Sequence, residues 1–216
     1  MSYLTFSHIC ASILQNGILC PQGETNMKVR PYQKKDFRYV QDICMATSKY
    51  ADEDTPLSRA ELCALFCDFY LDHQSDYCFV AVDDDDIPVG YVLCSVDRDE
   101  YEEKMAELYL PLVRKLNGSE YYSYNAEIKV TSRYVRQGYL AHLHIRILSS
   151  HATPELGEQL INTLEDKLRS MFVEGIYVIC PEKAEKARAF YEKIGYEDID
   201  FLSGSVVYGK KFFTED

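Results

Sequence analysis

Two histidines separated by one residue, in the segment AHLHIRIL, are the first side chains whose types and spacing suit chemistry. The segment alternates, so the apolar Leu143, Ile145 and Ile147 would share one face of a strand. His142 and His144 would lie together on the other face, where either imidazole could accept the proton of an attacking nucleophile. Two histidines at this spacing could also bind a metal. No carboxylate or cysteine stands at a matching spacing, however, so we expect no metal site.

The segment that follows, SSHATPELGEQL, has the residues that start a helix. Thr153 suits the N-cap position and Pro154 the first helical position. Backbone N–H groups at a helix N-terminus attract phosphate, and glycine at Gly157 permits a close approach. Glu155 works against such a site, because its carboxylate would occupy the same positive field of the helix dipole. Whether this helix binds phosphate therefore depends on where Glu155 points.

Hydrophobic periodicity after Met27 predicts alternating strands and helices. Helical spacing occurs at 34–48, 57–73, 98–118, 155–172 and 182–195, and β-rich runs occur at 27–32, 76–82, 89–96, 139–148, 175–180 and twice within 196–212. The tyrosine-rich segment 119–138 is predicted to be mostly loop, with a turn of helix near 126–130. Hairpins with turns at 83–88 and at Ser203-Gly204 and strand-helix-strand units together predict a mixed α/β sheet with helices on both faces.

Composition restricts the classes of function. The 216 residues, 47% of them apolar, suit one domain. The formal charge of −12, with no stripe of lysine and arginine, argues against nucleic acid as a partner. The eight cysteines lie in apolar runs, which indicates reduced core thiols and a cytoplasmic protein. Asp83 to Asp86, at a predicted hairpin tip, are interpreted as solvated acids rather than a cation site.

The N-terminal segment differs from the rest of the chain. It contains no lysine or arginine before Lys28, and its apolar runs are too short to cross a bilayer, so we expect neither a signal peptide nor a membrane partner. The segment MKVRPYQKKDF resembles the start of a domain. Residues 1–26 are therefore predicted to be an extension outside the core, and residues 27–216 a single domain.

Three segments, AHLHIRIL, GIYVIC and ARAFYEKIGYE, resemble the GNAT superfamily of acyl-CoA-dependent N-acetyltransferases. The segments RPYQKKDFRYVQDICMATS, DTPL, VGYVLCSVD and AHLHIRIL, with the long helical insertion, are similar to the bacterial branch related to the acetyltransferase-like domain of O-GlcNAcase. The likeness covers about residues 27–213. It implies the GNAT fold, a mixed but mostly antiparallel twisted sheet with helices on both faces, carried by residues 27–216 as a GNAT-like acetyltransferase domain.

The resemblance implies acetyl-CoA as co-substrate. In the superfamily the strand before the phosphate helix splays from its neighbour, and its backbone pairs with the pantetheine arm. The pyrophosphate loop of the superfamily falls on residues 152–157, where only Gly157 matches the family pattern. In the last helix, Ala184 stands where the family often has an asparagine. Arg146 could supply positive charge to the phosphates, or lie on the wrong face of the strand. The cofactor contacts implied are Ile145, Ile147, Leu148, Leu156, Gly157, Glu158, Ala187 and Tyr191.

Tyr191 matches a tyrosine that often stands near the thioester sulfur in this superfamily. A phenol carries its proton at neutral pH and could protonate the leaving thiolate as a general acid. The alternative is a tyrosine that closes the last helix over the core. For the base, the candidates are His142 and His144, with Glu127 as a weaker alternative.

Two functions remain open at this point. The first is an N-acetyltransferase acting on a small-molecule or peptide amine, which the acidic surface would favour in cationic form. The second is a non-catalytic GNAT-fold module for protein interaction or ligand sensing, favoured by Pro154, Glu155 and Ala184. The chain could form a homodimer, and Tyr121, Tyr122 and Tyr124 could line either an interface or a substrate cleft.

Overall fold

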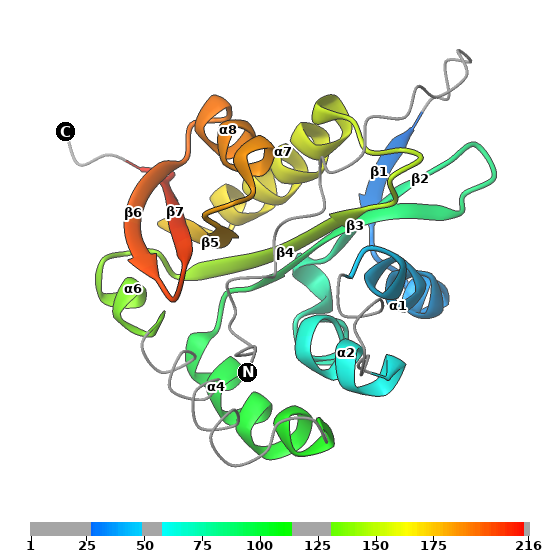
Figure 1. Ribbon diagram of the computed structural model, residues 1–216, viewed down its shortest axis with the longest axis horizontal. Helices are drawn as coiled ribbons and strands as arrows, with labels where there is room; N and C mark the ends of the chain where they lie inside the picture. The colour runs from blue at the N-terminus through cyan, green and yellow to red at the C-terminus, as the bar shows by residue number, and fades with distance from the viewer. Residues whose placement is uncertain (1–26, 49–57, 114–130, 214–216) are drawn as a thin grey trace.

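A sheet of seven strands forms the centre of the structure, a computed structural model that describes residues 27–48, 58–113 and 131–213 (Figure 1). The strand order is β1-β2-β3-β4-β5-β7-β6, and every neighbouring pair is antiparallel except β4 and β5. The predicted mixed, mostly antiparallel sheet is thereby confirmed. The strands are β1 (Lys28–Pro31), β2 (Phe79–Val82), β3 (Pro88–Ser95), β4 (Ala141–Ile147), β5 (Gly175–Pro181), β6 (Glu197–Leu202) and β7 (Ser205–Lys211).

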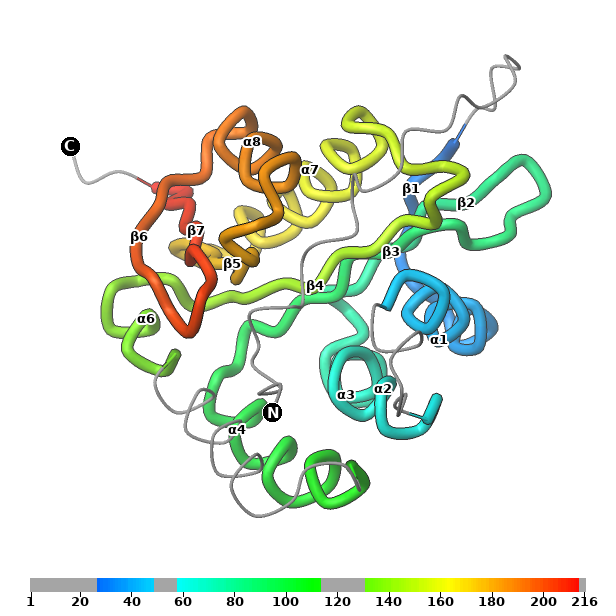
Figure 2. Tube along the Cα trace, viewed as in Figure 1, coloured from blue at the N-terminus to red at the C-terminus, as the bar shows by residue number. Residues whose placement is uncertain are grey.

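Helices cover both faces of this sheet, as predicted (Figure 2). One face carries α7 (Pro154–Ser170) and α8 (Glu185–Lys193). The other face carries α1 (Phe37–Ala46), α2 (Arg59–Phe66), α3 (Asp68–His73) and α4 (Arg98–Lys104), with α6 (Arg133–Arg136) beside β5 to β7. Each face therefore has its own apolar core, one under α7 and α8 and one under α1 to α4.

Several local predictions were wrong in detail. The predicted helix 57–73 divides at Cys67 into α2 and α3. The helix predicted for 98–118 ends at Lys104 and continues as a π-helical turn, Met105–Tyr109, and a 3-10 turn, Leu110–Leu112. Pro111 lies in that last turn, and a proline lacks the N–H that a continuing helix would need. The predicted turn of helix at 126–130 lies outside the described residues, whereas α6 occupies part of the predicted loop.

The cysteines and helices of the described residues agree with the composition. All six described cysteines are buried free thiols, which matches the expected reduced core thiols. Within the described ranges, no helix is long and apolar enough to cross a membrane.

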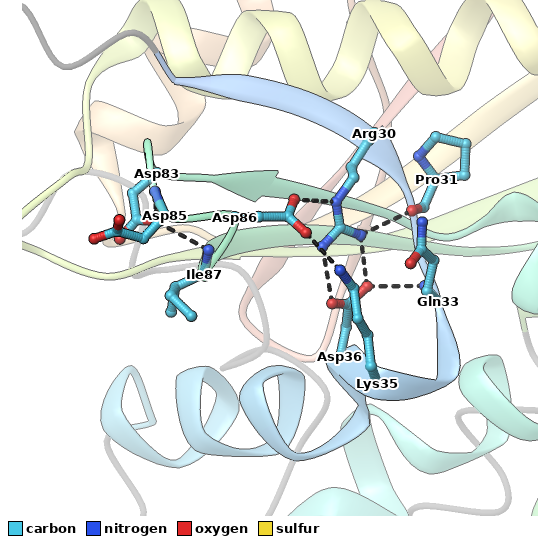
Figure 3. Close-up of polar contacts among 9 residues, drawn as sticks. All are labelled: Arg30, Pro31, Gln33, Lys35, Asp36, Asp83, Asp85, Asp86 and Ile87. Carbon is cyan, nitrogen blue, oxygen red and sulfur yellow. Dashed lines mark hydrogen bonds and ion pairs between the residues drawn. The ribbon is translucent and has the colours of Figure 1, made fainter.

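Charged side chains join β1 to the β2–β3 hairpin (Figure 3). The Arg30 guanidinium donates to both carboxylate oxygens of Asp36, at 2.7 and 2.9 Å, and through Nε to Asp86 at 2.7 Å. Asp36 is 1% exposed, and Lys35 binds the other oxygen of Asp86. Asp83 accepts the N–H groups of two residues in its own turn. The predicted row of solvated acids is thus partly an ion-pair network.

Strands β4 and β5 pair over a short length. In the described residues their ladder consists of Ala141 with Ile176 and His142 with Tyr177, and beyond His142 the two strands diverge. The odd-numbered residues of β4 face the core under α7, whereas His142 and His144 face α2 to α4. The sheet is therefore split at its centre, with His142 at the closed end of the split.

Candidate functional site

A small pocket lies where β4 and β5 diverge, on the face covered by α2 to α4. It offers about 20 Å³ to the centres of water-sized molecules, which is room for about one water. Its walls come from the two strands, from α2 to α4 and from Thr131. The lining residues are Leu65, Phe66, Tyr70, Arg98, Tyr101, Thr131, His142, Leu143, His144, Tyr177, Val178 and Ile179.

His142 lines this pocket at the closed end of the split and is 6% exposed. Its ring is 4.5 Å from that of Tyr101, 5.7 Å from that of Tyr70 and 5.6 Å from that of Tyr177, measured between centroids. Neither ring nitrogen has a hydrogen-bond partner among the described residues. Burial, helped by the charge of Arg98, lowers the pKa of His142 well below its ordinary value of 6.5. The imidazole is therefore neutral at physiological pH.

His144 shares the pocket but has a different environment. Its ring stacks on Phe66 of α2, with 5.7 Å between centroids. Nδ1 lies 3.4 Å from the Tyr91 hydroxyl, which also lies 3.9 Å from Cys67 Sγ. Burial raises the pKa of Tyr91 well above 10, so this hydroxyl keeps its proton. The structure thus brings the two predicted histidines together on one face, as the alternation indicated.

The inserted helix α4 supplies two pocket residues that sequence reasoning missed. Arg98, which is buried, donates to the Thr131 hydroxyl at 2.5 Å and lies over the Tyr101 ring at 5.1 Å. Tyr70 of α3 and Tyr177 of β5 were missed as well. All four lie far from His142 in sequence, so no local pattern could have indicated that they meet.

The backbone of β4 beyond His142 has one edge turned toward the split. Leu148 N donates to Val89 O at 2.9 Å. In the antiparallel β3–β4 register, the backbone N–H and C=O groups of the even-numbered residues of β4 therefore point toward β3. The N–H and C=O groups of Ile145 and Ile147 therefore point to the side where β5 has diverged. A linear ligand could pair with this edge as a strand would.

Leu148 does not share this arrangement. Its N–H donates to Val89 O, and its C=O accepts from His151 N at 2.9 Å. Both backbone groups are therefore already engaged. The predicted contact of Leu148 with the cofactor arm stays a prediction, and it would not use these two backbone groups unless their present hydrogen bonds broke.

The N-terminus of α7 is capped by its own residues. Thr153 Oγ1 accepts from Leu156 N at 3.2 Å, and Thr153 O accepts from Gly157 N at 3.1 Å. Pro154 contributes no donor, and Glu155 is exposed. The predicted phosphate contacts of Leu156, Gly157 and Glu158 stay a prediction, and any phosphate there would have to share or displace the Thr153 cap.

Arg146 lies away from this helix terminus. It is buried and donates to the carbonyl of Ile145. As an even-numbered residue of β4 it lies on the face of His144, opposite to α7. Of the two sequence interpretations of Arg146, the structure therefore favours the one in which it does not reach the phosphates.

Tyr191 and Ala187 are buried in the core under α7 and α8. The Tyr191 ring stacks on Tyr208 with 5.8 Å between centroids and also contacts Phe190 and Tyr196. These positions are compatible with a core role for Tyr191. Its predicted role as a general acid stays a prediction.

The protein-family model of the GNAT acetyltransferases matches residues 40–196. The chain belongs to this family. The GNAT family uses acyl-CoA, and its match spans the splayed strands and both helices on the α7 side. A sequence search of curated proteins found no match.

Several solved structures share the GNAT fold. The protein SsHAT is 24% identical, with a TM-score of 0.71 over 86% of this chain and 98% of that chain. The polyamine N-acetyltransferase of Drosophila melanogaster, which forms N-acetylagmatine, is 18% identical, with a TM-score of 0.59 over 87% and 100%. A PaiA N-acetyltransferase from Thermoplasma acidophilum in complex with coenzyme A is 11% identical, with a TM-score of 0.57 over 87% and 99%.

Proposed function

We propose that this protein transfers an acetyl group from acetyl-CoA to a primary amine by direct attack. The observation that carries the proposal is the split between β4 and β5. The β4 edge of the split presents the backbone of Ile145 and Ile147. The pocket lined by His142 and His144 lies beside the closed end of the split. One side of the split can thus hold an extended acyl carrier while the other admits an amine.

The residues of the chain then divide the chemistry. Ile145 and Ile147 would hold the pantetheine arm through their backbone, and a backbone N–H of β4 would donate to the acetyl oxygen as charge develops there. His142 or His144 would receive, directly or through water, the proton that the amine loses. Tyr191 would protonate the departing thiolate. The Drosophila neighbour, which forms N-acetylagmatine, and the Thermoplasma neighbour in complex with coenzyme A support acetyl transfer from CoA to an amine. The residue roles are proposed from this chain alone.

Contacts to the diphosphate are the second part of the cofactor site. N–H groups of Leu156, Gly157 and Glu158 would face it, with Ala187 lining the approach from α8. Gly157 and Ala187 are both buried, and both are small residues.

A non-catalytic role has one specific observation in its favour. The first turn of α7 is closed by the Thr153 cap and carries the exposed Glu155. A module that had lost CoA binding could keep the fold and serve in protein interaction or ligand sensing. The competing proposals differ in whether acetyl-CoA binds at all.

Calorimetry with acetyl-CoA on the purified full chain separates them. Saturable binding is expected, and no heat at millimolar cofactor would leave only the non-catalytic role. Activity is then followed as CoA release with a panel of primary amines. Tyr191→Phe should lower kcat by about a hundredfold, within the usual range for a general acid, with little change in KM. Tyr196→Phe, which alters a neighbouring ring of the same core, is the matched control.

The finer assignments belong to the same proposal. A place in the branch related to the acetyltransferase-like domain of O-GlcNAcase rests on the long helical insertion and the segments RPYQKKDFRYVQDICMATS, DTPL, VGYVLCSVD and AHLHIRIL. We also propose a single domain at 27–216 with an extension at 1–26, and action in the cytoplasm, as a monomer or homodimer, on a small-molecule or peptide amine.

A further inference from the structure

The His142 side chain carries hydrogen-bonding capacity that the described residues do not use. It is 6% exposed, and both ring nitrogens lack a partner in the part of the chain that the structure describes. A neutral imidazole has one donor and one acceptor nitrogen, and leaving them unmatched in a buried place costs free energy. The ring lines the pocket, so a small polar group in the pocket could meet that capacity.

The surroundings of this ring disfavour a positive charge. The titratable and charged groups that face the pocket among the described residues are Arg98 and Tyr101 of α4, Tyr70 of α3, Tyr177 of β5 and His144 of β4. Tyrosines are uncharged at neutral pH, so these phenols supply no anion. A cation beside His142 would therefore lose water without gaining an anionic partner, and it would meet the field of Arg98, which already lies over the Tyr101 ring.

We propose that the pocket binds the acceptor amine in its neutral form, so that the enzyme prefers weakly basic primary amines to strongly basic alkyl amines and polyamines. This inference rests on the proposed acetyltransferase function and names its substrate class. Burial and Arg98 also lower the pKa of the His142 imidazole well below 6.5, which is the same discrimination against positive charge at this position. An ammonium group placed beside the ring would meet the same two effects.

The chemistry of a neutral amine fits this position. One of its N–H groups can donate to the acceptor nitrogen of His142, while its lone pair stays directed at the thioester carbon. An ammonium group has no lone pair and would have to lose its proton before attack. The pocket has room for about one water, which suits an amino group. The remainder of the acceptor would lie outside the pocket.

Two amines of similar size test the preference. Ethylamine is protonated between about pH 6 and 9, as alkyl amines are, whereas the fluorines of 2,2,2-trifluoroethylamine keep it mostly neutral in that range. We expect kcat/KM for ethylamine to rise about tenfold per pH unit, while that for trifluoroethylamine stays level. A rising limb common to both amines and centred near the ordinary histidine pKa would overturn the proposal, because an enzyme group would then control the proton.

A binding measurement keeps this test separate from catalysis. In the full chain labelled at histidine, the ring signals of His142 are followed by NMR without acetyl-CoA, and assigned with His142→Asn. We expect trifluoroethylamine to shift these signals and ethylamine to leave them unchanged at neutral pH. Equal shifts with both amines would refute neutral-amine selection. If no amine supports CoA release, the acetyltransferase proposal fails, whereas the NMR result still decides the preference of the pocket.

Discussion

At the scale of single residues, His142 couples the site to the stability of the fold. Its pKa is lowered in the folded protein, mainly by burial, so the unfolded chain binds the extra proton first as pH falls. Stability from the neutral ring is complete above about pH 6.5 and is lost below it, until the folded pKa is reached. This residue therefore predicts acid sensitivity in a range where carboxylates are still ionised.

Urea unfolding at several pH values measures this effect. The free energy of unfolding should fall by about 1.4 kcal/mol per pH unit below about pH 6.5 through His142 alone. His142→Asn should remove that part of the slope, whatever its effect on stability at neutral pH. His151→Asn, in the turn before α7, is the control and should keep it. An unchanged slope in His142→Asn would show that another group is responsible.

Glu155 sets the second prediction at this scale. Its exposed carboxylate lies in the first turn of α7, where it benefits from the field that would hold a phosphate. Removing an acid there changes the interaction by about 0.3–1 kcal/mol, so Glu155→Gln should tighten acetyl-CoA by about two- to fivefold in calorimetry. Glu185→Gln, which removes an acid from the first turn of α8 instead, is the control and should leave the affinity unchanged. Equal affinities for wild type and Glu155→Gln would place the diphosphate away from this carboxylate.

Sequence reasoning identified the residues of the strand better than those around it. Alternation was enough to place His142 and His144 on one face, because side-chain direction in a strand depends on parity alone. Arg98 and Tyr70 reach the pocket from other elements, through packing that no spacing encodes. The same limit applies to Leu148, whose backbone direction became clear only from its pairing with Val89.

At the scale of elements, the ion pairs around Arg30 hold β1 and the hairpin of β2 and β3 in register. Asp36 is buried and receives two bonds from Arg30 and one from Gln33 N. Asp36→Ala would leave the guanidinium with the exposed Asp86 and the Pro31 carbonyl, and breaking a buried pair costs about 3 kcal/mol. Chemical denaturation should show that loss, with a smaller effect for Asp86→Asn. Similar losses for both variants would mean that burial does not set the strength of the pair.

The order of elements was predictable, whereas two helix ends were not. Thr153 and Pro154 marked the start of α7, Gly195 marked the end of α8, and Ser203-Gly204 marked a turn in which both residues have positive φ. The division at Cys67 and the π-helical turn after Lys104 depend on tertiary packing. Met105, for example, is fully buried in the core under α1 to α4, and periodicity alone did not reveal the change of helix type.

At the scale of the whole molecule, β1 is the first strand of the described residues. Residues 1–26 lie outside the described residues, while β1 starts at Lys28 and pairs with β2 along its length. A chain that starts at Met27 should fold with an unchanged melting temperature and bind acetyl-CoA like the full chain. Circular dichroism and calorimetry measure both properties. Loss of the folded signal in this truncation would make residues 1–26 part of the domain.

The short ladder between β4 and β5 also gives the molecule a reporter in amide exchange. The amides of Ile145 and Ile147 point into the split, whereas that of Leu148 is held by Val89 O. In deuterated buffer the first two should exchange with solvent much faster than the third. An acyl carrier lying along β4 would slow them and leave Leu148 unchanged. The amides of Ile145 and Ile147 would thus record, without any turnover, whether the sheet has gained the strand that its centre lacks.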